Sequence, residues 1–118
     1  MKVLKFERKM EPGWRTLGNA ALCLRVPDFL APGEREHIYW LTDLQTKPES
    51  RRKGLANALM RQVCSEADEH GKSLLLTPRP DNDEPTADQL KAWYFKHRFA
   101  VIQNADGVVP CLMLRGPQ

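Results

Sequence analysis

The sequence lacks any long apolar run and has few cysteines. No stretch approaches the ~20 apolar residues of a membrane-spanning helix, and the first ten residues, MKVLKFERKM, lack the apolar region of a signal peptide. The three cysteines are an odd number without Cys-x-x-Cys spacing. We therefore expect a soluble cytoplasmic protein with reduced thiols, no membrane association, no disulfide framework and no metal site.

An excess of charge is also absent. The 118 residues carry 18 lysines and arginines against 15 acidic residues, a formal net charge of +3, and basic residues cluster only at residues 51–53. The sequence has no RNA-binding aromatic pattern and no recognition-helix signature, so we do not expect nucleic acid as a partner. The length suits a single domain over residues 1–118 with one hydrophobic core.

The first 46 residues have the pattern of antiparallel strands. Residues 2–9 alternate between apolar and polar side chains, and residues 21–26 and 38–46 are rich in apolar, β-branched and aromatic side chains. Turn residues separate these stretches, among them Gly13 and Gly18. We expect a three-stranded antiparallel meander.

The middle of the chain predicts a strand, helix, strand unit. Apolar residues recur at every fourth position from Leu55 to Ala67, which predicts a helix over residues 54–70. Gly71 can end this helix in a left-handed conformation, and residues 72–77 have the length and composition of a strand. Strands joined by a helical crossover lie parallel in the sheet.

The C-terminal part predicts one more helix and a hairpin. Residues 78–86 are rich in proline and acidic side chains and predict a loop that ends in a capping box. A helix should follow over residues 87–97, and residues 99–103 and 108–114 should pair as a terminal hairpin.

A basic turn containing one glycine lies between the strand at 38–46 and the helix that follows. The first N–H groups of a helix lack intrahelical partners and lie at the positive end of its dipole, which favours an anion such as phosphate. Gly54 removes the Cβ that would hinder an anion, and Arg51, Arg52 and Lys53 add positive charge. Neither the Walker A pattern nor the Gly-x-Gly-x-x-Gly pattern is present. A solvated basic helix start remains the alternative on this turn alone.

Two motifs, one across this turn and one nearer the C-terminus, resemble motifs of one enzyme family. The run Leu44-x-Thr46-x-Pro48-x-x-Arg51-x-x-Gly54-x-Ala56 resembles the acyl-CoA-binding signature of the GNAT N-acetyltransferases, apolar-x-Val-x-Pro-x-x-Arg/Gln-x-x-Gly-x-Gly/Ala. Its spacing matches at every position. Thr46 replaces the family's usual valine and keeps the β-branch that favours a strand.

The second motif is the run Leu90 to Phe99, which resembles the family's Leu-x-x-x-Tyr-x-x-x-Gly-Phe helix end. Tyr94 occupies the tyrosine position. Arg98 replaces the family glycine, so the helix exit lacks the residue that adopts a left-handed conformation most easily. Ala87 stands where the family has a coenzyme-binding asparagine, and Thr86 is the nearest polar substitute. Together the two motifs extend the resemblance over roughly residues 38–115.

The resemblance implies a fold of the α/β (α+β) class. It has a mixed, mostly antiparallel sheet with a central splayed parallel strand pair and two main helices, and the cleft between the parallel strands takes the pantetheine arm. A full-length member inserts two helices after its first strand. This chain has little room for them, so they are missing or reduced to a short turn around residues 11–20 or 28–37. The apolar surface thereby exposed suggests a homodimer.

The resemblance also implies acetyl-CoA as co-substrate. It gives Tyr94 the role of acid on the departing thiolate and Asp43 that of a candidate general base. The residues expected to bind the coenzyme are Leu44, Gln45, Thr46, Arg51, Arg52, Lys53, Gly54, Leu55, Ala56 and Thr86.

Alternatives stay open for both catalytic residues. Tyr94 could be a core aromatic residue of an amphipathic helix. Strict alternation turns Asp43 away from the face of Thr42 and Leu44, so a base at Asp43 needs a β-bulge. Asp43 could equally be a solvated or ion-paired carboxylate, and a water relay could replace a base.

Two functions follow from the resemblance. The first is an acetyl-CoA-dependent N-acetyltransferase acting on a primary amine of a small molecule, or on a lysine or N-terminus of a protein. The second is a non-catalytic domain of the same fold that binds coenzyme A or a protein partner. The acidic residues Asp81, Asp83, Glu84 and Asp88 would attract a cationic amine, or simply form a solvated loop.

Overall fold

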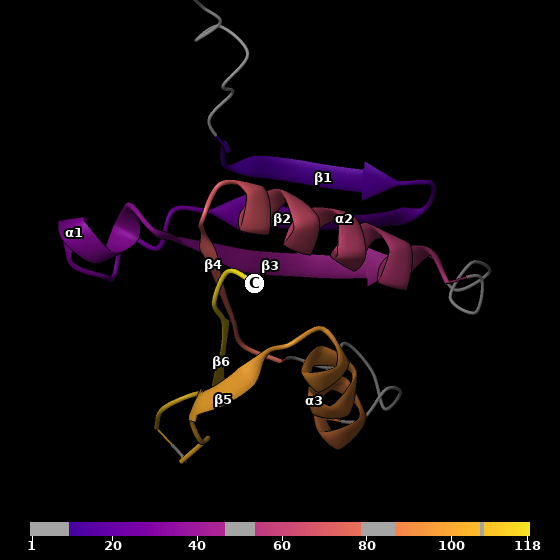
Figure 1. Cartoon of the computed structure of the whole chain (residues 1–118). Helices are drawn as coiled ribbons and strands as arrows, with labels where there is room; N and C mark the ends of the chain where they lie inside the picture. Colours follow the sequence, from indigo (N-terminus) through magenta and orange to yellow (C-terminus); the bar gives the residue numbers. More distant parts are fainter. Residues whose placement is uncertain (1–9, 47–53, 79–86, 107) are drawn as a thin grey trace, which may run out of the picture.

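The computed structural model describes residues 10–46, 54–78, 87–106 and 108–118 and forms one six-stranded sheet with three helices (Figure 1). The strand order is β1-β2-β3-β4-β6-β5. The β3 and β4 strands are parallel, and the other neighbouring pairs are antiparallel, which confirms the expected fold class. The elements are β1 (Gly13–Leu17), β2 (Ala20–Arg25), α1 (Pro32–Arg35), β3 (Ile38–Thr46), α2 (Leu55–Glu69), β4 (Ser73–Leu76), α3 (Ala87–Lys96), β5 (Ala100–Gln103) and β6 (Leu112–Arg115).

The N-terminal meander differs from the prediction in its first strand. The β1 strand occupies Gly13–Leu17, a segment predicted as a turn because of its flanking glycines, whereas the strand expected at 2–9 lies outside the described residues. Gly18 adopts a φ of +58° in the turn to β2. Between β2 and β3 the chain forms only the four-residue helix α1.

The main core lies between α2 and the sheet. The α2 helix buries Leu59, Met60, Val63, Cys64 and Ala67, close to the predicted stripe, and Leu55 packs at its edge. Burial of one large aliphatic side chain is worth about 1.5–3 kcal/mol, so this face holds the helix on the sheet. The side chains that face α2 from the sheet include Leu22, Leu24, Leu74, Leu76 and Met113.

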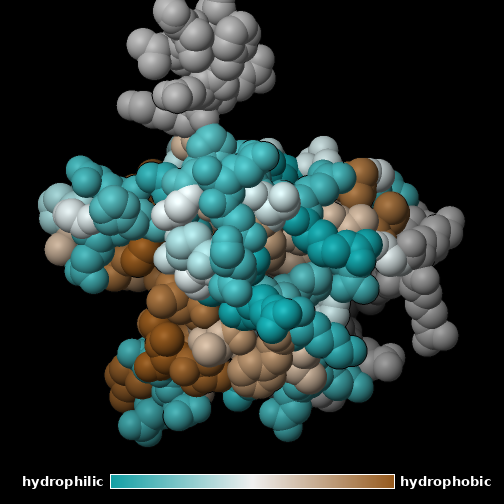
Figure 2. Space-filling model, viewed as in Figure 1, coloured by the Kyte–Doolittle hydropathy of each residue, from teal (hydrophilic) through white to brown (hydrophobic). Residues whose placement is uncertain are grey.

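The C-terminal hairpin begins later than predicted. Its second strand starts at Leu112 instead of residue 108, because Pro110 lacks a donor for the ladder and Val108 is 95% exposed. A lone bridge between Asp106 and Val109 lies in the connection. Figure 2 shows a brown apolar patch over β5 and β6, while teal polar residues cover the outer face of α2. The exposed apolar side chains in this C-terminal part include Ile102, Val108 and Val109.

An ion pair fastens the C-terminal end of α2 to β6 and α3. Arg115 donates from Nη1 and Nη2 to the two carboxylate oxygens of Asp68, at 2.7 and 3.0 Å, and from Nε to the His97 carbonyl at 2.9 Å. The Gln118 backbone N–H also donates to Asp68, at 2.9 Å. These bonds hold the pKa of Asp68 below its usual value, chiefly through Arg115.

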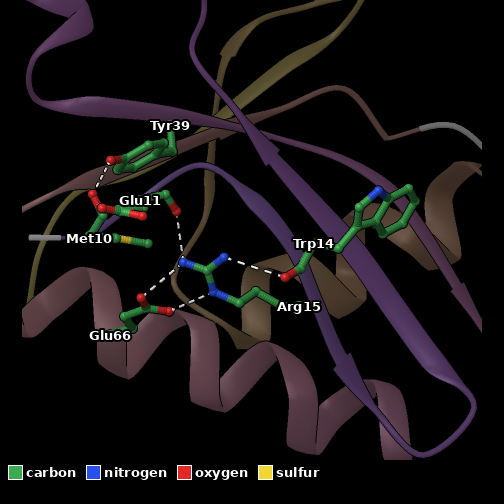
Figure 3. Close-up of polar contacts among 6 residues, drawn as sticks. All are labelled: Met10, Glu11, Trp14, Arg15, Tyr39 and Glu66. Carbon is green, nitrogen blue, oxygen red and sulfur yellow. Dashed lines mark hydrogen bonds and ion pairs between the residues drawn. The ribbon is translucent and has the colours of Figure 1, made fainter.

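A second ion pair fastens β1 to α2. Arg15 donates from Nε and Nη2 to the Glu66 carboxylate at 3.0 Å each, and from Nη2 to the Glu11 carbonyl at 2.8 Å (Figure 3). Tyr39 donates its hydroxyl to the Met10 carbonyl beside this cluster. Trp14 points away from α2 in the same view, because successive residues of a strand face opposite sides of the sheet.

Candidate functional site

The turn into α2 has the backbone conformation expected of an anion site. Gly54 is the N-cap residue, with a φ of +75°, a conformation that favours glycine. No side chain of the described residues caps this helix start, and its first turn holds no acidic residue. A Cβ built on Gly54 meets none of the described atoms within 4 Å. The positive end of the α2 dipole therefore has no compensating negative charge within the first turn.

Several predicted binding residues cannot be placed. Arg51, Arg52, Lys53 and Thr86 lie outside the described residues, and for Thr46 only the backbone is described. Leu44, Gln45, Leu55 and Ala56 are described on either side of the turn. In the described residues α2 thus follows β3 directly in element order, and residues 47–53 between them lie outside the described residues.

The parallel pair separates toward its C-terminal ends. The register of β3 with β4 covers only Ile38 with Ser73, Tyr39 with Leu74 and Trp40 with Leu75. The β3 strand continues to Thr46, still paired with β2, whereas β4 ends at Leu76 and diverges from it (Figure 1). The β3 extension that carries Leu44 and Gln45 therefore has one edge not taken by β4.

A β-bulge lies on this extension at Asp43. Ala21 faces Gln45 and Cys23 faces Thr42, so β3 has one residue more than β2 between these pairs. Asp43 absorbs the extra residue with a φ of +57°. The sequence indicated that a base at this position requires such a bulge, and the bulge is present.

The Asp43 carboxylate lies at the surface in a polar cluster. Its Oδ2 accepts hydrogen bonds from Arg25 Nη2 at 3.2 Å and from Thr42 Oγ1 at 3.0 Å. About half of each ionic side chain is exposed, 48% for Asp43 and 54% for Arg25. This arrangement is the ion-paired carboxylate named above as the alternative to a base.

Tyr94 is a buried residue of α3, with 5% of its surface exposed. Its ring packs edge-on against Trp93, at 5.1 Å between centroids, and against Phe99, at 5.6 Å. The ring is thus part of the core, whether or not the hydroxyl also serves chemistry.

The exit of α3 keeps a left-handed residue although the family glycine is replaced. Arg98 has a φ of +74°, and the Phe99 N–H donates to the Tyr94 carbonyl at 3.2 Å, which closes the helix end as a glycine would. A left-handed conformation costs a residue other than glycine about 1–2 kcal/mol. The chain therefore keeps a left-handed helix end after Tyr94, and Arg98 bears the backbone strain.

Sequence reasoning missed a polar contact between α2 and α3. Asn57 Oδ1 accepts a hydrogen bond from Trp93 Nε1 and lies 3.2 Å from His97 Nε2. The Trp93 and His97 rings also pack edge-on, with centroids 4.8 Å apart. Nothing in the sequence links Asn57 to a residue 36 positions later, so only the structure could reveal this contact.

The three cysteines are buried and form no disulfide. Burial raises the pKa of Cys64 to about 11, so it stays a neutral thiol at neutral pH. Within the described ranges, no group of three His, Cys, Asp or Glu side chains could hold a metal ion. None of the described helices is both long enough and apolar enough to span a membrane.

Comparisons with known proteins agree with this geometry. A sequence model described as the acetyltransferase (GNAT) family matches residues 20–102, from the start of β2 to β5. No curated protein sequence matches the chain. Among solved structures, the anti-CRISPR protein AcrVA5 is similar, with a TM-score of 0.66 and 20% identity over 89% of this chain and 98% of its own.

Two longer enzymes are similar in fold. The ribosomal-protein-S18-alanine N-acetyltransferase of Escherichia coli has a TM-score of 0.56 at 18% identity, with 83% of this chain and 61% of that chain covered. The Bacillus subtilis N-acetyltransferase YlbP, solved in complex with coenzyme A, has a TM-score of 0.54 at 16% identity, with coverage of 83% and 60%. The chain thus spans almost all of AcrVA5 and about three fifths of these enzymes.

Proposed function

Since this chain belongs to the GNAT acetyltransferase family, we propose that it transfers the acetyl group of acetyl-CoA to a primary amine of a small molecule or protein. The observation that carries the proposal is the splayed end of β3 together with the left-handed Gly54 at the start of α2, where no side chain of the described residues caps the helix. An extended thioester arm and a pyrophosphate need these two features side by side.

We assign coenzyme binding to both features. The free edge of β3 would pair with the pantetheine arm through the backbone of Leu44, Gln45 and Thr46. The first N–H groups of α2, at Leu55 and Ala56, would bind the pyrophosphate, with Gly54 leaving room for it. Arg51, Arg52, Lys53 and Thr86 belong to this assignment through the family resemblance alone.

Acetyl-CoA supplies the activated acyl group as a thioester. Transfer forms a carbon–nitrogen bond and breaks the carbon–sulfur bond, so the amine loses a proton and the sulfur gains one. We assign the proton on sulfur to the Tyr94 hydroxyl, whose ring is fixed by Trp93 and Phe99. The amine proton would pass to Asp43 or to water. Arg25 already occupies part of the Asp43 carboxylate, which favours water.

A second candidate function is a domain that binds coenzyme A or a protein without catalysis. The burial of Tyr94 and the ion pair at Asp43 are the observations that support this second candidate. A homodimer would suit either function. Trp14, Val26 and Phe29 are exposed on the reduced N-terminal half, and they support this part of the proposal. The unpaired cysteines support a reducing compartment such as the cytoplasm.

The test is calorimetry and thermal unfolding with acetyl-CoA, coenzyme A and 3′-dephospho-coenzyme A. A ligand at ~100 times its dissociation constant should stabilise the fold by about 2.7 kcal/mol. A panel of primary amines and lysine peptides then tests transfer by release of free thiol. Binding with no transfer to any acceptor would favour the non-catalytic domain. No binding of any coenzyme would overturn the acetyltransferase and the coenzyme-binding domain, and would leave only a domain that binds a protein.

A further inference from the structure

Asn57 connects the start of α2 to α3 through a single oxygen atom. It lies three positions after Gly54, on the turn that we assign to the coenzyme. Its Oδ1 accepts from Trp93 Nε1 and faces His97 Nε2 at 3.2 Å. Trp93 immediately precedes Tyr94, and His97 is the first residue after α3.

The identity of the donors fixes how this contact is protonated. An indole N–H can only donate, so the Asn57 atom that faces Trp93 must be the carbonyl oxygen. The same oxygen faces His97, so His97 must carry its proton on Nε2. Burial, and then the charges of Arg61 and Arg115, hold the pKa of His97 below its usual value, which keeps the ring neutral at neutral pH. One oxygen thus accepts two N–H donors from α3.

A second link between α2 and the end of α3 runs through Arg115 of β6 at the opposite end of α2. There Arg115 bridges Asp68 and the His97 carbonyl through charged, largely buried groups. The contact at Asn57 is neutral and exposed by comparison. A change at the first turn of α2 would therefore alter the Asn57 contact while the Arg115 contact holds.

We propose that Asn57 is a positioning residue that couples coenzyme binding at the start of α2 to the placement of α3 and of Tyr94. The inference rests on the proposed function, because it requires coenzyme A to bind at that helix start. Coupling between two sites is reciprocal. If the Asn57 contact allows bound coenzyme to stabilise the ordered position of α3 by some factor, the ordered position of α3 raises coenzyme affinity by the same factor.

The experiment measures amide hydrogen exchange of residues 90–97 with and without saturating coenzyme A, together with the dissociation constant by calorimetry. In the wild type, coenzyme A should slow this exchange by roughly tenfold. In Asn57→Leu the slowing should disappear even at saturation, and affinity should fall by a similar factor. Asn57→Asp keeps an acceptor oxygen and should restore the slowing at saturation, while its negative charge at the phosphate end of α2 should keep affinity low. The exposed Gln62→Leu is the matched control.

Trp93→Phe tests the same contact from α3, because it removes the N–H donor and keeps an aromatic ring at position 93. It should reproduce Asn57→Leu, and it replaces that variant if Asn57→Leu fails to fold. Equal slowing in wild type and Asn57→Leu would show that the coupling to α3 does not pass through Asn57, and would overturn the inference. Calorimetric binding to wild type without slowing of residues 90–97 would also overturn it while leaving the proposed function intact.

Discussion

The two ends of α2 differ in how the chain satisfies them. At the C-terminal end, Asp68 is held by Arg115 and by the Gln118 backbone N–H. At the N-terminal end, no side chain in the described part of the chain caps the helix, and the first turn has no acidic residue. Both ends pass through a left-handed glycine, at φ +75° for Gly54 and +64° for Gly71. The C-terminal end of α2 is thus completed by contacts within the chain, whereas the positive charge of its N-terminal end suits an anionic ligand.

The largest expected effect is on turnover, at Tyr94 of α3, the helix that Asn57 contacts from the ligand end of α2. Tyr94→Phe should lower kcat roughly 10²- to 10⁴-fold, the usual range for one acid–base group, because solvent must then protonate the thiolate. The phenylalanine ring keeps the packing against Trp93 and Phe99. Coenzyme affinity should barely change. Steady-state kinetics with any accepted amine gives both quantities, and full turnover in the variant would remove Tyr94 from the chemistry.

The next effect belongs to the completed end. Asp68→Ala should lower the free energy of unfolding by about 3 kcal/mol, because it leaves the Arg115 side chain, only 6% exposed, without its carboxylate. Coenzyme affinity should stay within about twofold. Denaturant unfolding and calorimetry provide the two measurements, with the exposed neighbour Glu69→Ala as control. A large loss of affinity in Asp68→Ala would break the contrast between the ends.

The two glycines allow a matched pair of variants. Gly54→Ala and Gly71→Ala each place a Cβ in a left-handed residue with no described atom within 4 Å, so each should cost about 1 kcal/mol of stability. Only Gly54→Ala should also weaken coenzyme binding, by about tenfold, a loss of about 1.4 kcal/mol. Equal coenzyme affinity in the two variants would contradict the assignment of the phosphates to the Gly54 turn.

The exit of α3 offers a stabilising change of similar size. Arg98→Gly should raise the free energy of unfolding by about 1 kcal/mol, because glycine adopts a φ of +74° without the strain that arginine bears. Arg98→Ala should bring no such gain. Thermal unfolding of the two variants separates relief of backbone strain from loss of the arginine charge.

The smallest effect is a pH dependence at His97. Its pKa lies below 6.5 in the folded protein, chiefly because of burial, so the unfolded chain binds this proton at higher pH than the native one. Stability should therefore be constant above about pH 6.5, fall as the pH drops through 6.5 toward the native pKa, and level off below it. His97→Gln should show a shallower fall over this range in denaturant titrations. An identical slope in both proteins would contradict the shifted pKa.

The elements that sequence predicted best are those with a strong local pattern. The apolar stripe of α2, its stop at Gly71 and the strand at Ser73–Leu76 follow from spacing and turn chemistry alone. The β1 strand was missed because the Gly13 and Gly18 turn signals obscured its short alternation. Local patterns therefore gave the parallel pair and its crossover.

The contacts that fasten α2 follow from no local pattern. Arg15 reaches Glu66 over 51 positions, and Arg115 reaches Asp68 over 47. Both arginines lie on strands and look like ordinary exposed cations in the sequence. The alternation of the strand predicted that a base at Asp43 needs a bulge. It could not predict that the Asp43 carboxylate pairs with Arg25. Long-range pairing of polar groups depends on the packing of whole elements, which one sequence does not reveal.

The short seam between β3 and β4 also bears on the order in which the molecule folds. The β1, β2 and β3 strands are neighbours in both chain and sheet, so their contacts close short loops. The seam instead joins Ile38 to Ser73 across all of α2 and gains only three residue pairs. Closing so long a loop costs entropy before these few pairs form. We therefore expect the meander to form early and the seam to close late. Destabilising substitutions at the seam should then raise the unfolding rate more than they lower the refolding rate.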